Sequence, residues 1–135
     1  MIVSTRGRYA LRVMIDLAEH GGTDCVAMRE IAARQEISLK YLEKILPSLV
    51  SGGLIEGTHG KGGGYRLLRQ PEDITAGEVL RLTEGDLSPV ACLTCDADPC
   101  SRTAECRTRP MWTQLNNLIN RYLDGVTLAD LMQHQ

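Results

Sequence analysis

The chain has 135 residues, of which 43% are hydrophobic and 24% are charged, so it is long enough for one folded domain and is neither disordered nor collagen-like. Its net charge of −2 argues, over the whole chain, against a nucleic-acid-binding protein. The charge is uneven, however: residues 1–70 carry ten Lys and Arg against seven Asp and Glu, a balance of +3, whereas residues 71–135 carry a balance of −5. This asymmetry favours a polyanionic partner for the first half, although solvated faces would give the same pattern by chance.

No segment of the sequence has the pattern of a membrane span or of a signal peptide. There is no run of 18 apolar residues, and residues 1–12 (MIVSTRGRYALR) lack an apolar core followed by a small-residue cleavage site. We therefore expect a cytoplasmic protein with no membrane partner. Structural disulfides are rare in that compartment, so grouped cysteines indicate a metal or redox site.

Three helices are predicted in the first 53 residues, where apolar positions recur at helical spacing. They are expected from residue 4 or 5 to about 19, over residues 28–35, and, after a brief turn at residues 36–37, over residues 38–51. Ser38 suits the N-cap of the third helix, and Gly52-Gly53 closes it. Pro47 lies inside this helix and is expected to kink it or to end its first part, because proline lacks the backbone donor.

Two short strands are predicted at residues 54–58 and 65–68, joined by the glycine-rich stretch 59–64 (HGKGGG). The glycine spacing fits neither a phosphate-binding loop, which needs Ser or Thr where Gly62 stands, nor a dinucleotide fingerprint, which needs glycine where Tyr65 stands. The order of helix, short helix, turn, helix and hairpin is that of a winged helix-turn-helix. We therefore expect a mainly α fold with a small β-hairpin wing; a plain flexible hairpin is the alternative for this stretch.

The second half of the chain predicts a short helix at residues 75–84, a longer one at residues 110–123 and a last short one at residues 127–132. The apolar stripe of the longer helix is wider than one small neighbour needs, so we expect a C-terminal dimerisation helix, with an intramolecular core as the alternative. These elements divide the chain into a winged helix-turn-helix DNA-binding region, residues 1–70, and residues 71–135, which hold a sensing loop at about 86–109 and the dimerisation helix.

Candidate DNA contacts lie at the start of the third helix and on the hairpin. Lys40 and Lys44 can both reach the DNA backbone, and Glu43 can accept a hydrogen bond from cytosine unless it pairs with one of these lysines. His59 and Lys61 at the hairpin tip suit a wing that lies along the backbone or enters the minor groove. The full set of candidates is Ser38, Lys40, Tyr41, Glu43, Lys44, Thr58, His59, Lys61 and Arg66.

Four of the five cysteines form a candidate metal or redox site, whereas Cys25 stands apart and is interpreted as an ordinary thiol. The four are Cys92, Cys95, Cys100 and Cys106. Four thiolates suit either a 2Fe–2S or 4Fe–4S cluster or a tetrahedral zinc site. Structural zinc sites usually have two paired knuckles and only one Cys-x2-Cys pair occurs, which favours an iron–sulfur cluster over zinc. A reversible thiol switch, or no function at all, remains open.

Five motifs resemble the bacterial IscR/NsrR family of winged-helix repressors. They are residues 4–10 (STRGRYA), 37–43 (ISLKYLE), 60–65 (GKGGGY), 74–79 (ITAGEV) and the Cys106-x5-Trp112 pattern. The resemblance runs from residue 1 to about 131. It implies a homodimeric transcription regulator that binds palindromic operators in double-stranded DNA and senses iron–sulfur status, nitric oxide or redox state through a cluster with three cysteine ligands and a variable fourth ligand.

The same resemblance assigns cysteine positions. Cys100 and Cys106 occupy the second and third family positions, and Cys92 or Cys95 the first. Arg109 stands where some relatives have a ligating His, and Arg8 where others have an acidic ligand, and neither arginine can ligate iron. The extra cysteine then completes an all-cysteine set. The family's wing often carries Arg where this chain has His59, which implies weaker or pH-dependent contact with the minor groove.

We therefore predict a homodimeric DNA-binding transcription regulator, a repressor, controlled by an iron–sulfur cluster; the alternative is the same regulator with a thiol/disulfide switch or zinc. An enzyme is not expected, because no βαβ pattern surrounds the Cys92-x2-Cys95 pair as it would in a thiol oxidoreductase. An RNA-binding module is not expected either, because Phe is absent and only 4% of residues are aromatic.

Overall fold

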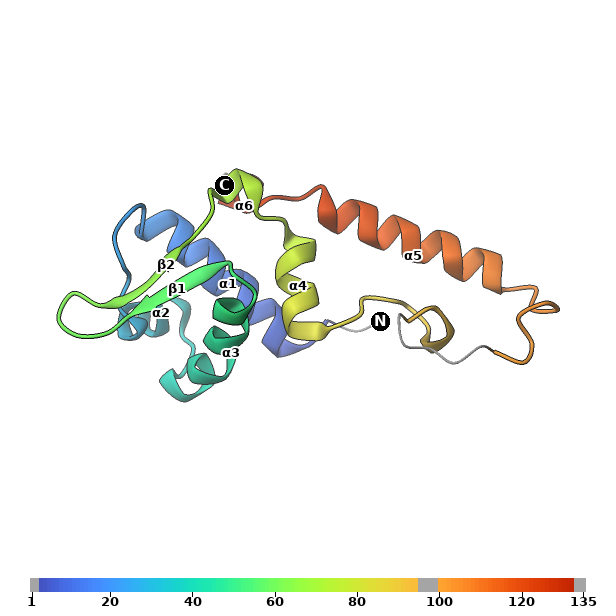
Figure 1. The fold of residues 1–135 in the computed structure, drawn as a ribbon, viewed down its shortest axis with the longest axis horizontal. Coiled ribbons are helices and arrows are strands. Elements are labelled where there is room, and N and C mark those ends of the chain that lie inside the picture. The colour runs from blue at the N-terminus through green and yellow to red at the C-terminus, as the bar shows by residue number, and fades with distance from the viewer. Residues whose placement is uncertain (1–2, 95–99, 133–135) are drawn as a thin grey trace.

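The computed structural model describes residues 3–94 and 100–132, and Figure 1 shows them as a helical body from which one long helix extends. The elements are α1 (Thr5–His20), α2 (Met28–Gln35), α3 (Leu39–Ser51), β1 (Ile55–Thr58), β2 (Gly64–Leu67), the 3₁₀ turn η1 (Pro71–Asp73), α4 (Ala76–Glu84), the 3₁₀ turn η2 (Ala91–Leu93), α5 (Arg109–Asp124) and α6 (Leu128–Met132). This is the predicted mainly α fold with a two-stranded hairpin, so the expected fold class is confirmed.

Side-chain caps set the starts of three helices. The hydroxyl of Ser4 accepts from the backbone N–H of Gly7 at the start of α1, and that of Ser38 accepts from Tyr41 at the start of α3. Thr75 and Glu78 form the predicted capping box at the start of α4. Each cap satisfies a backbone donor that the first helical turn leaves without a partner, which is why the sequence located these helix starts well.

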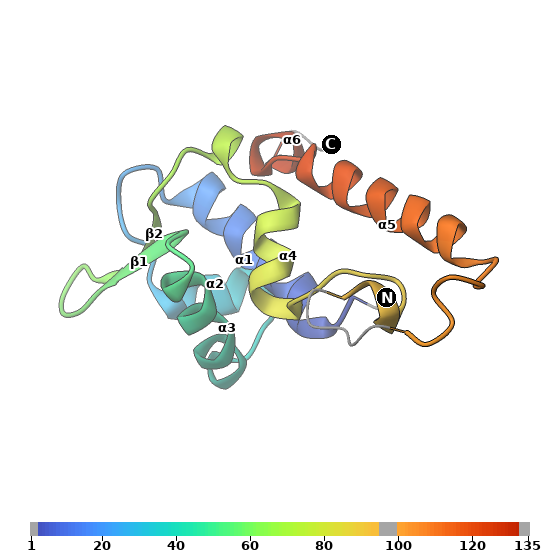
Figure 2. The same cartoon turned by 45° about the vertical axis from the view of Figure 1, so that its right-hand side comes forward.

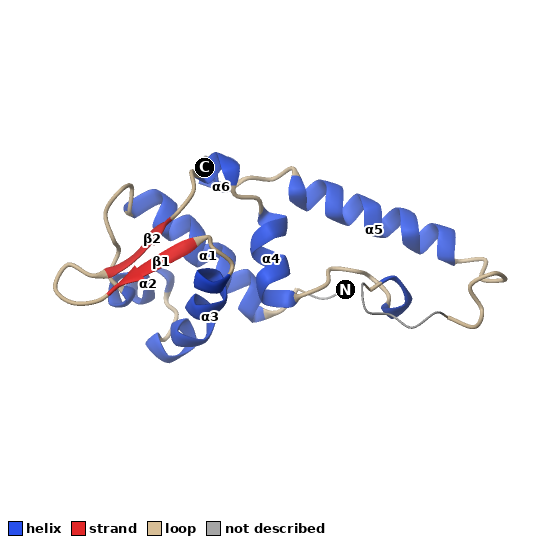
Figure 3. Ribbon diagram, viewed as in Figure 1, coloured by secondary structure: helices blue, strands red, loops and turns tan. Residues whose placement is uncertain are grey.

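The hairpin pairs β1 and β2 in antiparallel register, with Ile55 opposite Leu67 and Thr58 opposite Gly64. It is joined to the rest of the body through Val26, whose backbone N–H and C=O bond to Tyr65 at 2.8 and 2.9 Å. Gly64 has φ +151°, and a Cβ there would meet the backbone carbonyl of Val26. The hairpin therefore requires glycine where it passes the segment that precedes α2. Figure 3 shows the two strands at the end of the molecule away from the far end of α5.

The core is built around α1, which contributes Ala10, Val13, Met14 and Leu17 to a cluster that also contains Leu42, Ile45 and Leu49 of α3. Helices α4 and α6 pack against α1 as well, so the packed body includes elements from beyond residue 70. Among the described residues, no helix is both long and apolar enough to cross a bilayer.

Pro47 does not end the third helix. Helix α3 continues through it to Ser51, so the expectation that proline would end its first part was wrong. Pro47 is exposed, whereas Leu46 and Leu49 are buried in the core. The apolar side chains on either side of the proline therefore hold both halves of the helix against the body, and this packing outweighs the loss of one backbone hydrogen bond.

Candidate nucleic-acid interface and cysteine segment

The outward face of α3 carries three charged side chains. Lys40, Glu43 and Lys44 are all exposed near the start of the helix, and its opposite face is buried in the core. Within the described residues, Glu43 forms no ion pair with either lysine, which speaks against the interpretation that it serves only as their partner. Ser38 is exposed and uses its hydroxyl oxygen to cap the helix. The start of α3 therefore presents charges that are free to meet a partner.

Tyr41 differs from its neighbours because its ring is half-buried. The ring packs edge-on against that of Tyr9 in α1, with 5.3 Å between centroids, and the guanidinium of Arg12 lies 5.0 Å from the centroid of Tyr9. Tyr41 thus anchors the start of α3 to α1 as well as lying beside the exposed lysines.

The hairpin places the predicted wing residues in two environments. Thr58, His59 and Lys61 are exposed at and beside the tip. Arg66 instead forms an ion pair with Glu56, directly across the hairpin, so part of its charge is neutralised within the protein. The thiol of Cys25 donates to the hydroxyl of Thr58 at 3.7 Å, a contact that joins residues 33 positions apart and that no local pattern could have indicated.

Arg6 makes contacts with α3 that the sequence did not indicate. Its guanidinium donates to the hydroxyl of Ser48 at 2.9 Å and to the backbone carbonyl of Lys44 at 3.4 Å. Both acceptors lie on α3, so the start of α1 is fixed to the helix that carries the exposed lysines. Only the high basic charge of the N-terminal region hinted at this role.

Residues 85–108, here called the cysteine segment, connect α4 to α5. Cys92 is half-buried in η2, Cys100 is exposed, and Cys106 is half-buried just before α5. Cys95 lies outside the described residues. In the described part of the chain, no three Cys, His, Asp or Glu side chains are grouped as a metal site. Thiols are donors that suit an iron–sulfur cluster, but the described thiols are not grouped at a single site.

Cys106 lies where its thiolate is stabilised. The pKa of its thiol is lowered first by the hydrogen bond with the hydroxyl of Thr108, and further by the backbone N–H groups of Thr108 and Arg109 and the charge of Arg102. The sulfur and the Thr108 hydroxyl oxygen are 3.5 Å apart. The free N–H groups at the start of α5 add to the effect of the Thr108 hydroxyl, because a helix N-terminus favours negative charge. Cys106 is therefore suited to ligate a soft metal or to react with an oxidant.

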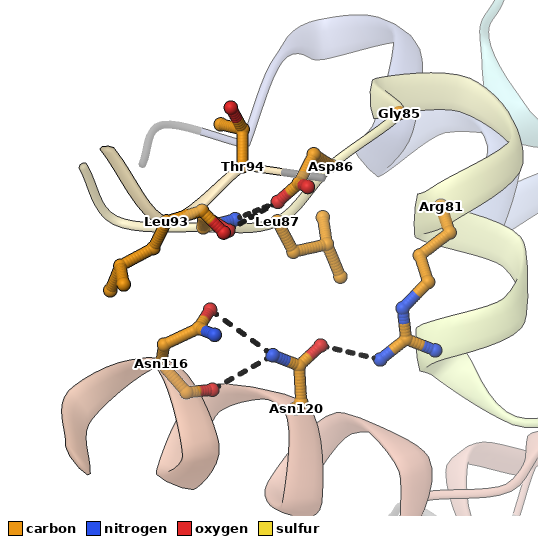
Figure 4. A pocket seen from close by; sticks show the side chains of 9 residues that line it. Arg81, Gly85, Asp86, Leu87, Leu93, Thr94, Asn116 and Asn120 are labelled. Atoms are coloured by element: carbon orange, nitrogen blue, oxygen red, sulfur yellow. Dashed lines mark hydrogen bonds between the residues drawn. The ribbon is translucent and has the colours of Figure 1, made fainter. Parts of the chain in front are cut away.

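A cavity of about 390 Å³ lies between α4, the start of the cysteine segment and α5 (Figure 4). Arg81 of α4 pairs with Asp124 at 2.7 Å and donates to the side-chain oxygen of Asn120 at 2.6 Å. Asn120 in turn donates to the backbone and side chain of Asn116. The opposite wall contains Leu87 and Leu93 of the cysteine segment. This polar network fixes α5 to α4 at the point where the cysteine segment begins.

The other side of α5 is apolar, and the part of the chain that the structure describes leaves it exposed. Its four large side chains are 38–71% exposed and follow one another at intervals of four, three and four residues: Met111, Leu115, Leu118 and Tyr122. No residue of α5, all of which the structure describes, is fully buried. These four side chains therefore do not belong to an intramolecular core of the described residues, whereas Trp112, Ile119 and Leu123 of the same helix are half-buried.

Comparison with known proteins gives one consistent family. The model of the Rrf2 family, described as an iron-dependent transcriptional regulator, matches residues 3–134. The chain is 42% identical to protein rrf2 of Nitratidesulfovibrio vulgaris over 98% of this chain and 88% of that one. It is 35% identical to the HTH-type transcriptional regulator IscR of Aliivibrio salmonicida over 98% of this chain and 77% of that one.

Solved structures agree with these relatives. CymR, the global cysteine regulator of Bacillus subtilis, superposes with a TM-score of 0.80 at 34% identity, over 100% of this chain and 98% of that one. The oxidized form of Staphylococcus aureus CymR superposes with a TM-score of 0.76 at 32% identity, over 100% of this chain and 98% of that one. The similar proteins that carry a functional name are regulators, in agreement with the expectation that the chain is not an enzyme.

Proposed function

The chain belongs to the Rrf2 family of DNA-binding transcriptional regulators, and from this premise we propose that it is a homodimeric repressor of palindromic operators whose DNA affinity is set by the cysteine segment. The observation that carries the proposal is the face of α3 on which Lys40, Glu43 and Lys44 are exposed and not paired with one another, while the opposite face is buried.

On DNA, the start of α3 enters the major groove, as the second helix of a helix-turn-helix does. Lys40 and Lys44 bind phosphates, and Glu43 accepts from a cytosine amino group. His59 and Lys61 follow the backbone or the minor groove from the hairpin. Arg66 contributes less, because Glu56 already neutralises part of its charge.

A second copy of the chain is the partner that the apolar stripe of α5 fits. Intervals of four and three residues keep a stripe on one side of a helix when two such helices pack together. The four side chains of this stripe are exposed in the protomer, and a two-fold axis at this helix presents the same face to itself. Two copies related in this way carry two α3 helices, which is the symmetry that a palindromic site requires.

An iron–sulfur cluster is the cofactor that we propose for the cysteine segment, with Cys92, Cys100 and Cys106 as ligands and Cys95 completing an all-cysteine set. Support comes from the soft thiolate donors, from the stabilised thiolate of Cys106 and from the family's description as iron-dependent. Such a cluster would supply iron that changes oxidation state and reacts with oxygen or nitric oxide. Zinc is a weaker alternative for the same thiols.

The protein's part in this response is a change in the cysteine segment. The described thiols are not grouped, so binding a cluster requires the segment to close. The first residues of the segment line the same cavity as Arg81 of α4 and Asn120 of α5, so its closure would act on both helices. Movement of α5 changes the spacing of the two α3 helices in a dimer and hence the affinity for a palindrome.

A thiol switch is the second candidate, favoured by the lowered pKa of Cys106 and by the similarity to CymR, one structure of which is of an oxidized form. In this case the thiolate of Cys106 attacks one oxygen of a peroxide and breaks its O–O bond; the sulfur loses two electrons and becomes a sulfenic acid, and the other oxygen leaves as water or an alcohol. A second cysteine thiol then condenses with the sulfenic acid, which releases water and leaves a disulfide. The same segment would then change shape without a metal.

One experiment distinguishes the iron–sulfur cluster from the thiol switch. The protein is purified without oxygen, and its absorbance spectrum and its contents of iron and acid-labile sulfide are measured. The cluster proposal expects iron, sulfide and visible absorbance that Cys106→Ser removes. Wild-type protein without iron or sulfide after reconstitution would contradict it, and a disulfide found by mass spectrometry after peroxide treatment would then support the thiol switch. Cys25→Ser is the matched control, because this thiol lies outside the cysteine segment.

A further inference from the structure

Asp16 of α1 is the one charged residue that is fully buried among those the structure describes. Its two carboxylate oxygens accept from Arg34 at 2.8 and 3.0 Å, and one of them also accepts from the side-chain amide of Gln35 at 2.9 Å. Arg34 and Gln35 are the last two residues of α2. A buried carboxylate with this many donors therefore fixes the end of α2 to α1.

Arg12 holds the same end of α2 from a second direction. Its Nε donates to the side-chain oxygen of Gln35 at 3.2 Å, and its Nη2 donates to the backbone carbonyl of Gln35. That carbonyl is one of those that a helix end leaves without an intrahelical partner. Gln35 is thus held by side chain and backbone, through Asp16 on one side and Arg12 on the other.

The next residue, Glu36, adopts a left-handed backbone conformation, with φ 54° and ψ 46°. It is the one non-glycine residue with positive φ in the described chain. Its N–H and that of Ile37 both bond to the carbonyl of Ala32, which is the usual way for a helix to end with a left-handed residue. Glycine adopts this conformation freely, whereas a side chain makes it unfavourable, so the surrounding contacts must maintain it.

This turn leads directly into α3. Only Ile37, which is buried, and the capping residue Ser38 separate Glu36 from the first residue of α3. A change in the backbone at Glu36 therefore rotates the helix that carries the exposed lysines. The guanidinium of Arg12 also packs on Tyr9, whose ring contacts Tyr41 near the start of α3. Arg12 thus contacts both ends of the connection between α2 and α3, directly or through one ring.

We propose that Arg12 and Asp16 are positioning residues for sequence recognition: by holding Gln35 they keep Glu36 in its left-handed conformation and so fix the angle at which α3 meets DNA. The proposal rests on the proposed DNA-binding function. Base recognition needs side chains at fixed positions in the groove, whereas binding to any DNA depends on charge. Loosening the turn should therefore reduce discrimination between sequences more than it reduces binding to unrelated DNA.

The test compares two dissociation constants for each variant of the full chain. One is for a duplex that wild-type protein selects from a random pool, and the other is for an unrelated duplex of the same length at the same salt concentration. Arg12→Met is expected to weaken binding to the selected duplex by about tenfold while changing binding to the unrelated duplex by a factor of about two. Arg12→Lys retains the charge but not the two-pronged contact with Gln35, so it should also lose discrimination.

Rescue distinguishes positioning from general loss of structure. Adding Glu36→Gly to Arg12→Met should restore most of the discrimination, because glycine holds positive φ without help. The control is Val79→Ala in α4, a buried residue that belongs to neither helix joined by the turn, which lowers stability and should leave the ratio of the two dissociation constants unchanged. Denaturant titration of every variant confirms that it is folded.

An unchanged ratio in both Arg12→Met and Arg12→Lys would overturn the positioning role while leaving the proposed DNA-binding function intact. Failure of Glu36→Gly to rescue a folded Arg12→Met would overturn the claim that the role acts through the turn. Wild-type protein that selects no sequence from the pool would instead refute the proposed function itself, which is a distinguishable result.

Discussion

The carboxylate of Glu84, the last residue of α4, accepts hydrogen bonds from both the backbone N–H and the hydroxyl of Ser4, which caps α1. Gly85, with φ +81°, follows at once and begins the cysteine segment. Because Arg6 of α1 is bonded to Ser48 of α3, hydrogen bonds connect the start of the cysteine segment, through α1, to the helix proposed to read DNA. Figure 2 shows α4, α1 and α3 together in the body of the protein, with the cysteine segment leaving the end of α4.

Glu84→Ala should lower the free energy of unfolding by about 1 kcal/mol, the net contribution of a partly exposed hydrogen bond. Gly7→Ala should act through the same contact, because a Cβ at Gly7 would meet the Glu84 carboxylate. The double variant should therefore be less destabilised than the sum of the two single variants. Denaturant titration measures all three, and simple additivity would show that Gly7 and Glu84 do not interact.

Asp16→Asn should lower the free energy of unfolding at neutral pH by about 2 kcal/mol, because the buried Asp16 carboxylate loses its charge-assisted hydrogen bonds from the partly exposed Arg34 and from Gln35. Burial alone raises the pKa of Asp16, but the hydrogen bonds from Arg34 and Gln35 and the charges of Arg34 and His20 outweigh it, and the pKa is lowered. A lowered carboxyl pKa stabilises the fold above the pKa of the unfolded chain, near 4, and this stabilisation is lost as the pH falls through the folded pKa.

The difference in the free energy of unfolding between wild type and Asp16→Asn should accordingly be large at pH 7 and shrink towards pH 3. Urea titrations of both proteins at a series of pH values measure it. A difference that stays constant over this range would show that the charge of Asp16 is not what stabilises the contact between α1 and α2.

Cys106 should react with iodoacetamide at a lower pH than an ordinary thiol, because its thiolate is stabilised by Thr108 and by the start of α5. Thr108→Val should move the midpoint of the pH profile upward. Thr103→Val is the matched control, since the hydroxyl of Thr103 bonds to the backbone carbonyl of Cys100 and not to a thiol. Mass spectrometry of alkylated peptides gives the profile, and identical midpoints for wild type and Thr108→Val would refute the assigned cause.

Leu118→Arg should convert the proposed dimer into a monomer, because it places a charge in the middle of the apolar stripe of α5. Leu118 is 59% exposed in the protomer, so the substitution should leave the fold intact. Thr113→Arg adds the same charge on another side of the same helix and should remain dimeric. Sedimentation equilibrium measures the mass of each variant in solution, and an unchanged mass for Leu118→Arg would exclude this face as the dimer interface.

Lys40→Ala should reduce the dependence of DNA affinity on salt, lowering the slope of log Kd against log salt concentration by about 1 for each phosphate that a subunit no longer neutralises. Arg107→Ala removes one positive charge from the cysteine segment and should leave the slope unchanged. Fluorescence anisotropy with a labelled duplex at several salt concentrations provides both slopes. Equal slopes for Lys40→Ala and wild type would place α3 away from the phosphates.

Local sequence signals predicted most of the fold. Several elements are fixed by signals that span only a few residues: the caps at Ser38 and Thr75 and the glycines around the hairpin. Such signals can be recognised without tertiary information. Of the two effects expected of Pro47, a kink or an end to the helix, the end does not occur, because packing of Leu46 and Leu49, a tertiary effect, keeps the helix continuous. The domain division at residue 70 remains a prediction, and α4 and α6 pack on the same helix as the elements before it.

The chemistry of the candidate site remains a prediction from the sequence, and its geometry could not be predicted. Thiol spacing indicated a metal or redox segment, yet the relative placement of Cys92, Cys100 and Cys106 depends on a long connection without periodicity. Asp16 was missed because a charged residue on a helix is normally solvated, and its burial depends on Arg34 and Gln35 from another element. The left-handed Glu36 was missed for a similar reason, since nothing in a glutamate indicates positive φ.

Control of DNA affinity by the cysteine segment is best tested by measuring the Kd for a selected duplex in different states of that segment. Protein purified without oxygen is compared before and after removal of bound metal and after peroxide treatment, with Cys106→Ser as the variant. We expect the Kd of wild type to change by about tenfold between at least two states, and that of Cys106→Ser to stay constant. Equal wild-type affinity in all three states would contradict control by the cysteine segment.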